Sequence, residues 1–173
     1  MRWRSAVTVA VAISALTVPA GAAHAVMSNE PSVLAPSDDT DYAAGKAAFN
    51  AGDWRGAIAN LTLVLIRRPW HDNAETMVAY SWRKLGDYDQ ALAHYATALQ
   101  LNPHNRGALE YLAEAYLTLG RVDDANATFI ELRKVCGTVV MAFDNNGWKN
   151  GCGELHDLEE AYAERGLPLP AAQ

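Results

Sequence analysis

Residues 82–103 have the sequence WRKLGDYDQALAHYATALQLNP, and two other segments repeat its landmarks at a spacing of 34 residues. The landmarks are a glycine and, five residues later, an alanine: Gly52 and Ala57, Gly86 and Ala91, Gly120 and Ala125. In two of the segments a proline follows twelve residues after the alanine, at Pro69 and Pro103. A fixed period of this length predicts stacked helical hairpins, whose product is an extended surface.

Apolar residues within each period fall at helical spacing. The second halves of the repeats carry them at Ala57, Leu61 and Leu65; Ala91, Tyr95 and Leu99; and Ala125, Phe129 and Leu132. The glycines are suited to end the first helix of each hairpin in a left-handed conformation. Asp53 and Asp87 then stand where a side-chain oxygen caps the second helix, and the prolines end that helix.

The second period also carries the pattern of a known repeat. It has Trp82, Gly86-Asp87-Tyr88, Ala91-Leu92, Tyr95, Ala98-Leu99 and Leu101-Asn102-Pro103. In these positions the chain resembles the tetratricopeptide repeat family. The resemblance covers about 38–136. It implies an all-α solenoid domain at 41–136 with three repeats, at 38–71, 72–105 and 106–139. The third repeat departs from the family pattern, because Cys136-Gly137 stands where the proline is expected.

The first 25 residues predict a secretory signal peptide. Arg2 and Arg4 precede an apolar run at 6–18, and Ala23-His24-Ala25 offers a cleavage site between small residues. A run of 13 residues is too short for a membrane span, which needs about 20. Cleavage after Ala25 would leave a chain without a membrane span, in the periplasm or secreted, that begins with a flexible segment at 26–40.

The charge of the remaining chain argues against nucleic acid. Of the 14 basic residues, the signal peptide removes Arg2 and Arg4, which leaves 12 against 20 acidic residues and a net charge of −8. Binding to a phosphate backbone depends on clustered lysine and arginine. We therefore expect a protein or peptide partner.

The sequence after the third repeat changes character. Residues 137–152 predict a loop or a short hairpin with an Asn-Gly turn, 153–166 a capping helix, and 167–173 a tail. Cys136 and Cys152 are the two cysteines of the chain, and in an exported protein such a pair predicts a disulfide. The alternative is a metal or redox site formed with His156, although structural zinc usually takes four ligands.

The sequence gives no recognisable catalytic motif or cofactor site. His71, Asp72 and Glu75 cluster between the first two repeats and would suit acid–base chemistry. The simpler interpretation is a polar helix start with Asp72 as its cap. We therefore expect no enzymatic activity, no cofactor and no metal.

The family resemblance implies that the first helix of each repeat lines a concave binding surface. It places ten residues there, in chain order: Tyr42, Lys46, Phe49, Thr76, Tyr80, Arg83, Lys84, Glu110, Glu114 and Leu117. Among them, Lys46, Arg83 and Lys84 are suited to hold a carboxylate or an acidic peptide. The aromatic members would supply contact area. The sequence thus predicts a protein- or peptide-binding scaffold of the cell envelope, with a structural or accessory subunit of a periplasmic assembly as the alternative.

Overall fold

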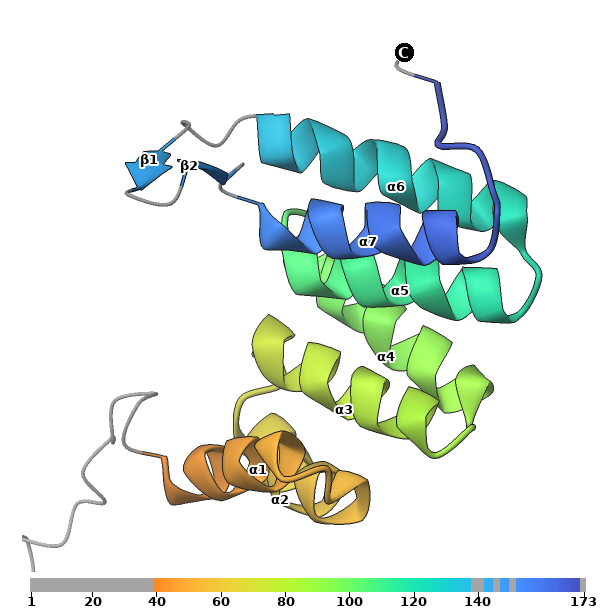
Figure 1. The fold of residues 1–173 in the computed structure, drawn as a ribbon. Coiled ribbons are helices and arrows are strands. Elements are labelled where there is room, and N and C mark those ends of the chain that lie inside the picture. The colour runs from red at the N-terminus through yellow and green to blue at the C-terminus, as the bar shows by residue number, and fades with distance from the viewer. Residues whose placement is uncertain (1–38, 138–141, 145–146, 150–151, 172–173) are drawn as a thin grey trace, which may run out of the picture. The chain divides into compact units, whose positions relative to one another are not determined.

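The computed structural model describes residues 39–137, 142–144, 147–149 and 152–171 (Figure 1). The predicted signal peptide at 1–25 and nearly all of the predicted flexible segment at 26–40 lie outside these residues. Half of the predicted loop at 137–152, namely 138–141, 145–146 and 150–151, lies outside them as well.

The described residues form seven helices and two short strands. In chain order these are α1 (Thr40–Asn50), α2 (Trp54–Arg67), α3 (Asp72–Lys84), α4 (Tyr88–Leu101), α5 (Arg106–Thr118), α6 (Val122–Gly137), β1 (Ala142–Asp144), β2 (Gly147–Lys149) and α7 (Gly153–Glu164). The second helices of the hairpins begin at Trp54, Tyr88 and Val122, 34 residues apart. The sequence period is therefore the period of the structure.

The turns between paired helices follow from glycine and from capping side chains. Gly52, Gly86 and Gly120 adopt positive φ angles of 74°, 85° and 71°, as predicted. Asp53 accepts a hydrogen bond from the amide of Gly56 at the start of α2, and Asp87 caps α4 in the same way. These local interactions fix where each hairpin reverses.

The start of α3 differs from the prediction. His71 is its N-cap, and Nδ1 of the ring accepts a hydrogen bond from the amide of Ala74. Asp72 is the first helical residue instead, and its carboxylate accepts hydrogen bonds from the side-chain amides of Asn102 and Asn105 at 2.6 and 3.0 Å. The prediction of Asp72 as the cap was wrong, because its carboxylate binds the following inter-repeat turn.

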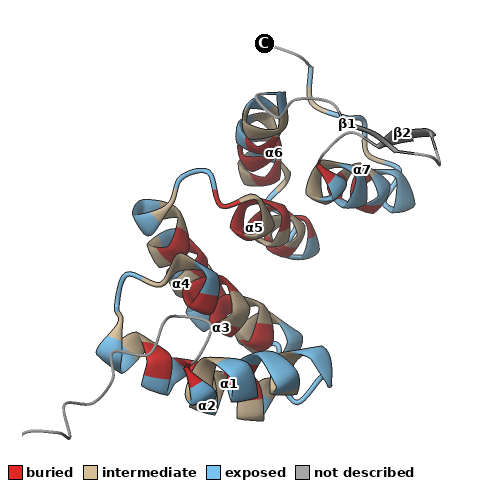
Figure 2. Ribbon diagram, turned by 90° about the vertical axis from the view of Figure 1, so that its left-hand side faces the viewer, coloured by how far each residue is buried: buried red, intermediate tan, exposed pale blue. Residues whose placement is uncertain are grey.

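The core lies between paired helices and between successive hairpins (Figure 2). Ala57, Ala91 and Ala125 are completely buried, and their small side chains let the paired helices approach closely. Gly45 in α1 is buried for the same reason, since a Cβ atom there would lie 2.6 Å from Cγ of Leu61. Helices α1, α3 and α5 contact one another in sequence, so the first helices form one continuous layer.

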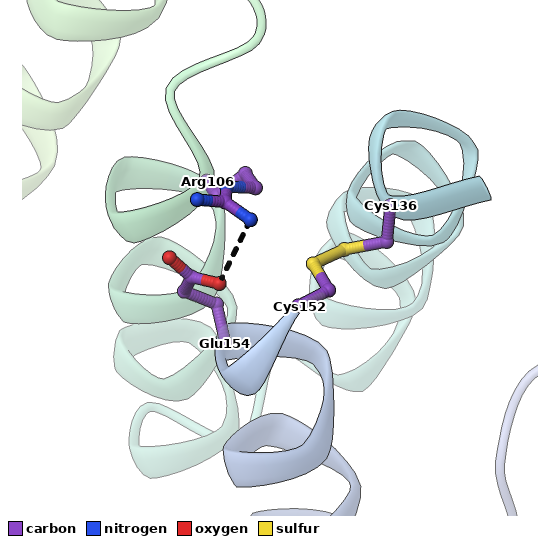
Figure 3. The surroundings of a disulfide bond; sticks show 4 residues. All are labelled: Arg106, Cys136, Cys152 and Glu154. Carbon is purple, nitrogen blue, oxygen red and sulfur yellow. Dashed lines mark ion pairs between the residues drawn. A yellow bond between two sulfur atoms is a disulfide. The ribbon is translucent and has the colours of Figure 1, made fainter. Parts of the chain in front are cut away.

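The C-terminal segment closes the stack. A disulfide joins Cys136 at the end of α6 to Cys152 before α7, with a Cα–Cα distance of 5.6 Å (Figure 3). Between the two cysteines, β1 pairs antiparallel with β2, Phe143 opposite Trp148. Beside the disulfide, Arg106 of α5 forms an ion pair of 3.6 Å with Glu154 of α7.

Helix α7 packs against α5 and α6. Leu158, Ala161 and Tyr162 are buried there, and the ring of Tyr162 meets that of Phe129 edge to face at 5.3 Å. The predicted fold class, a tetratricopeptide-type solenoid with a capping helix and a disulfide-closed loop, is confirmed. Among the described helices, none combines the length and the apolar character needed to cross a bilayer.

Candidate functional site

The face made by α1, α3 and α5 carries a continuous group of aromatic rings. We call Phe49, Trp54, Tyr80 and Tyr111 the aromatic cluster. Phe49 lies 5.7 Å from Trp54 and 5.1 Å from Tyr80 between ring centroids, and Tyr80 lies 4.7 Å from Tyr111. All four residues are half-buried. The cluster therefore links all three repeats and still offers ring surface to a ligand.

Two of the predicted binding cations lie over this cluster. The guanidinium of Arg83 is 4.8 Å from the ring centroid of Tyr80 and 5.6 Å from that of Tyr111. The ammonium of Lys84 lies 5.8 Å from Trp54 and 5.7 Å from Tyr80. All four distances fall within the range of cation–π attraction.

Arg83 is already paired within the chain. Its Nη1 donates a hydrogen bond of 2.5 Å to the carboxylate of Glu114, and burial leaves its side chain 11% exposed. Desolvation opposes its charge, but Tyr95 and Glu114 outweigh that effect and raise the pKa of Arg83. An acidic ligand at Arg83 would have to displace Glu114. Glu114 therefore competes with a ligand for the predicted carboxylate site.

Four of the ten predicted residues lie apart from the cluster. Tyr42 packs against His71 with ring centroids 4.7 Å apart, and Lys46 is exposed. Thr76 is buried, where its hydroxyl donates to the carbonyl of Asp72 and accepts from Asn105. Leu117 is buried in the core beneath α7. Thr76 and Leu117 thus serve packing rather than an open surface.

Next to the aromatic cluster is an open pocket of about 380 Å³ between α3, α5 and α7. We call it the acidic pocket. Its lining comprises Tyr80, Arg83, Glu110, Tyr111, Glu114, Asp157, Glu160, Ala161 and Glu164. Five of these residues are carboxylic acids and one is a cation. The predicted residues Tyr80, Arg83, Glu110 and Glu114 meet here, joined by three acids of the capping helix.

Glu110 is the most perturbed acid of this pocket. It is only 5% exposed, and burial raises its pKa to about 8, with further increases from Glu114, Asp157 and Glu154 and an opposing effect from Arg83. Burial and Glu110 likewise raise the pKa of Tyr111 to about 12. The lining of the pocket thus has more acids than cations, and burial keeps Glu110 protonated up to a higher pH than usual.

The residues considered for catalysis and metal binding have structural partners. His71 caps α3, and the carboxylate of Glu75 lies 2.6 Å from Nδ1 of His94. The two cysteines form the disulfide, and His156 lies 3.3 Å from Glu160 on the same helix. Across the described part of the chain, no three His, Cys, Asp or Glu side chains gather closely enough to hold a metal ion.

Sequence reasoning missed Trp54, Tyr111 and the three acids of α7. Trp54 begins α2 rather than a first helix, and Tyr111 directly follows the predicted Glu110. Asp157, Glu160 and Glu164 were predicted on a polar outer face. Their i, i+3 and i+7 spacing marks one helical face, which was the available signal. The interruption of the 34-residue period before α7 hid its alignment with α1, α3 and α5.

Known proteins resemble this chain in repeat and in fold. Residues 83–135 match the tetratricopeptide repeat family model. The TPR2B domain of yeast Sti1 in complex with pHsp70 has a TM-score of 0.60 at 22% identity, covering 72% of this chain and 94% of that one. PcrH bound to the chaperone-binding region of PopD has a TM-score of 0.58 at 21% identity, covering 72% and 90%.

A third structure is the first TPR of Spaghetti (RPAP3) bound to the HSP90 peptide SRMEEVD. It has a TM-score of 0.55 at 18% identity and covers 71% of this chain and 90% of that one. No curated protein matches the chain in sequence. The likeness to solved structures at these identities establishes the fold.

Proposed function

We propose that this tetratricopeptide repeat protein is a non-enzymatic scaffold that binds a protein or peptide along the layer of α1, α3 and α5. The observation that carries the proposal is the aromatic cluster, four half-buried rings in contact across three repeats. Aromatic residues dominate the energetics of protein recognition. The similar folds of Sti1, PcrH and Spaghetti were each solved with a peptide or protein segment bound, which supports the same use here.

The scaffold is largely formed before any ligand arrives. Its helices are fixed by capped turns and by buried inter-helix contacts, so a ligand meets a preset row of side chains. Binding to a preformed surface avoids the entropic cost of ordering the site. An extended segment lying across the aromatic cluster would reach the acidic pocket at its α5 and α7 side, because Tyr80 and Tyr111 belong to both.

We place this function outside the cytoplasm, in the periplasm or in the secreted state. The features that support this are the signal-peptide pattern at 1–25 and the pairing of both cysteines, which an oxidising compartment favours. Expression of the full sequence in a bacterium tests it: fractionation should find the protein in the periplasm, with a mass corresponding to residues 26–173 less two hydrogens. A full-length reduced protein in the cytosol would contradict this placement.

Selection from a random dodecapeptide library displayed on phage tests the binding function. Peptides enriched on the folded protein should lose at least tenfold in affinity on Phe49→Ala, because the side chain lies in the cluster. Trp70→Ala is the matched control, since Trp70 is a 69% exposed aromatic residue beyond the opposite end of α2 from Trp54. Enrichment of no peptide, or equal loss in both variants, would refute the proposal.

A further inference from the structure

The acidic pocket has one wall on the capping helix and one on the repeats. Helix α7 contributes Asp157, Glu160 and Glu164, whereas α5 contributes Glu110 and Glu114. Arg83 is the one cation among the lining residues, and Glu114 already neutralises it at 2.5 Å. Four carboxylic acids therefore surround the open space without a matching positive charge in its lining.

Glu110 is the independent observation that points to a ligand at this pocket. Its side chain is 95% buried by surface, and it lines the pocket. Among the described side chains it takes part in no ion pair within 4.0 Å, whereas its neighbour Glu114 does. A buried acid without a partner is costly, because desolvation disfavours its charged form. The elevated pKa of Glu110, about 8, reflects this cost.

The pocket also offers a surface on which an organic cation can rest. The guanidinium of Arg83 stacks on Tyr80 and Tyr111, which demonstrates that these rings accept a cation from within the chain. The carboxylates are too dispersed for a metal centre, since the described residues contain no group of three suitable ligands. A guanidinium or an ammonium on a flexible stem suits such a site, because its donors can reach separate carboxylates.

We propose that the acidic pocket binds an arginine or lysine side chain of the peptide that lies on the aromatic cluster. The partner is accordingly a basic segment, in contrast to the acidic peptide expected from Lys46, Arg83 and Lys84. The volume of about 380 Å³ falls within the range of about 300–1,000 Å³ usual for ligand sites. This inference rests on the proposed peptide-binding function and specifies its ligand chemistry.

Binding of a cation in the acidic pocket should release a proton from Glu110. An acid with only a structural role would not show this release. A bound cation favours the ionised form of Glu110, which Glu114, Asp157 and Glu154 disfavour and Arg83 favours. Binding at pH 7 should therefore release a fraction of a proton, and affinity should rise as the pH increases from 6 to 8. Calorimetry in two buffers of different ionisation enthalpy measures the release directly.

Two peptide probes test the charge requirement on the full chain. They are acetyl-tetra-arginine amide and acetyl-tetra-citrulline amide, which have nearly the same shape but differ in charge. We expect the arginine peptide to shift amide resonances of Glu110, Tyr111 and Ala161 in a nitrogen–proton correlation spectrum. The citrulline peptide should bind at least tenfold more weakly. Equal binding of both peptides, or shifts spread over every acidic surface, would overturn the proposal.

Substitutions of the pocket acids provide the matched comparison. Glu110→Gln should abolish the proton release, and Glu160→Gln combined with Glu164→Gln should weaken binding of the arginine peptide about tenfold. Glu159→Gln neutralises one acid of α7 that lies outside the pocket lining and should change affinity less than twofold. Equal effects of Glu159→Gln and of the double variant would overturn the pocket as the site.

The library-selected dodecapeptides separate this inference from the proposed function. If they depend on Phe49 and carry arginine or lysine whose replacement by citrulline costs tenfold, both proposals are supported. If they depend on Phe49 but bind without a basic residue, the charge inference fails while the binding function stands. If no peptide is enriched, the binding function fails, whatever the tetra-arginine probe does.

Discussion

Glu110 couples the stability of the fold to pH. Its pKa rises from 4.5 to about 8 on folding, chiefly because burial disfavours the carboxylate. Between these values the folded state retains a proton that the unfolded state has lost. The free energy of unfolding therefore falls as pH rises from about 4.5 to about 8, and this contribution is constant above that range.

Glu110→Gln should remove this pH dependence. The variant should gain stability relative to the wild type as the pH rises through that window, by about 1–4 kcal/mol at pH 9. Urea unfolding at pH 5, 7 and 9 measures the difference, and Glu159→Gln serves as a control for loss of one acid. A constant difference across the three pH values would contradict the assigned burial of the charge.

Individual side chains also show where sequence reasoning reaches its limit. The cap at Asp53 and the left-handed Gly86 follow from local chemistry, which a sequence carries in full. The pairing of Arg83 with Glu114 does not, because the two residues lie on different helices and meet only through packing. The same is true of Asp72, whose partners Asn102 and Asn105 belong to a turn one repeat away.

At the scale of the elements, the crossing of α1 and α2 depends on a single small residue. Gly45 occupies the position that is alanine in the next two repeats, at Ala79 and Ala113. A Cβ atom at Gly45 would lie 2.6 Å from Cγ of the buried Leu61 and 3.3 Å from its backbone nitrogen. The first hairpin is therefore packed more tightly than a methyl group allows.

Gly45→Ala should lower the free energy of unfolding by about 1–3 kcal/mol, because overpacking outweighs the helix propensity of alanine. Gly107→Ala in α5 is the control: the nearest atoms lie 3.8 Å or more from its Cβ position, so the change should be neutral or stabilising. Thermal unfolding followed by circular dichroism compares the two. If Gly45→Ala stabilised the protein, α1 would have to lie further from α2 than the distance of 2.6 Å between the Cβ position and Leu61 implies.

Helix α7 depends on both its apolar face and the disulfide. Leu158 and Tyr162 are completely buried, and the phenol of Tyr162 donates to Asn126 of α6 at 2.9 Å. The disulfide adds a restraint by closing a loop in the unfolded chain, for which the chain-entropy estimate is about 3 kcal/mol.

Replacement of Cys136 and Cys152 by alanine should destabilise the protein by about 2–4 kcal/mol. The loss of amide protection should be greatest in α7, and the tetra-arginine peptide should bind more weakly because three pocket acids reside there. Hydrogen exchange and the peptide titration measure the two effects. Dithiothreitol should lower the stability of the wild type but leave that of the double variant unchanged. A loss of amide protection that is equal in all helices would show that the disulfide does not act on α7 in particular.

The elements also explain which part of the site was predictable. The 34-residue period places α1 to α6 and hence the row that contains Phe49, Tyr80 and Glu114. It does not place α7, which starts at Gly153 after the period has been interrupted. Because α7 supplies one wall of the acidic pocket, the charge of the pocket could not be deduced from repeat alignment alone.

At the scale of the whole described stack, stability is distributed unevenly along the chain. The contacts run between each helix and its near neighbours, so cooperativity passes from hairpin to hairpin. Helix α1 has one buried residue, whereas α3 has six and α5 has seven. The interior hairpin and the α5–α7 contact thus hold most of the buried surface.

Native-state hydrogen exchange should show this gradient directly. Amides of α1 should exchange fastest among the seven described helices, and those of α3 and α5 should exchange only on global unfolding. A short pulse in deuterated buffer analysed by mass spectrometry distinguishes the elements. Equal protection of α1 and α3 would indicate a fully cooperative unit, in which the first hairpin does not open alone.

The disulfide brings together the two ends of the segment that joins α6 to α7. Cys136 and Cys152 are 16 residues apart in sequence, yet their Cα atoms are 5.6 Å apart. The segment between the two cysteines therefore begins and ends at nearly the same place, between the end of α6 and the start of α7. Its length could change without moving α7 from its place in the layer of first helices. We expect that new sequence can be inserted between the two cysteines while the layer of α1, α3 and α5 remains intact.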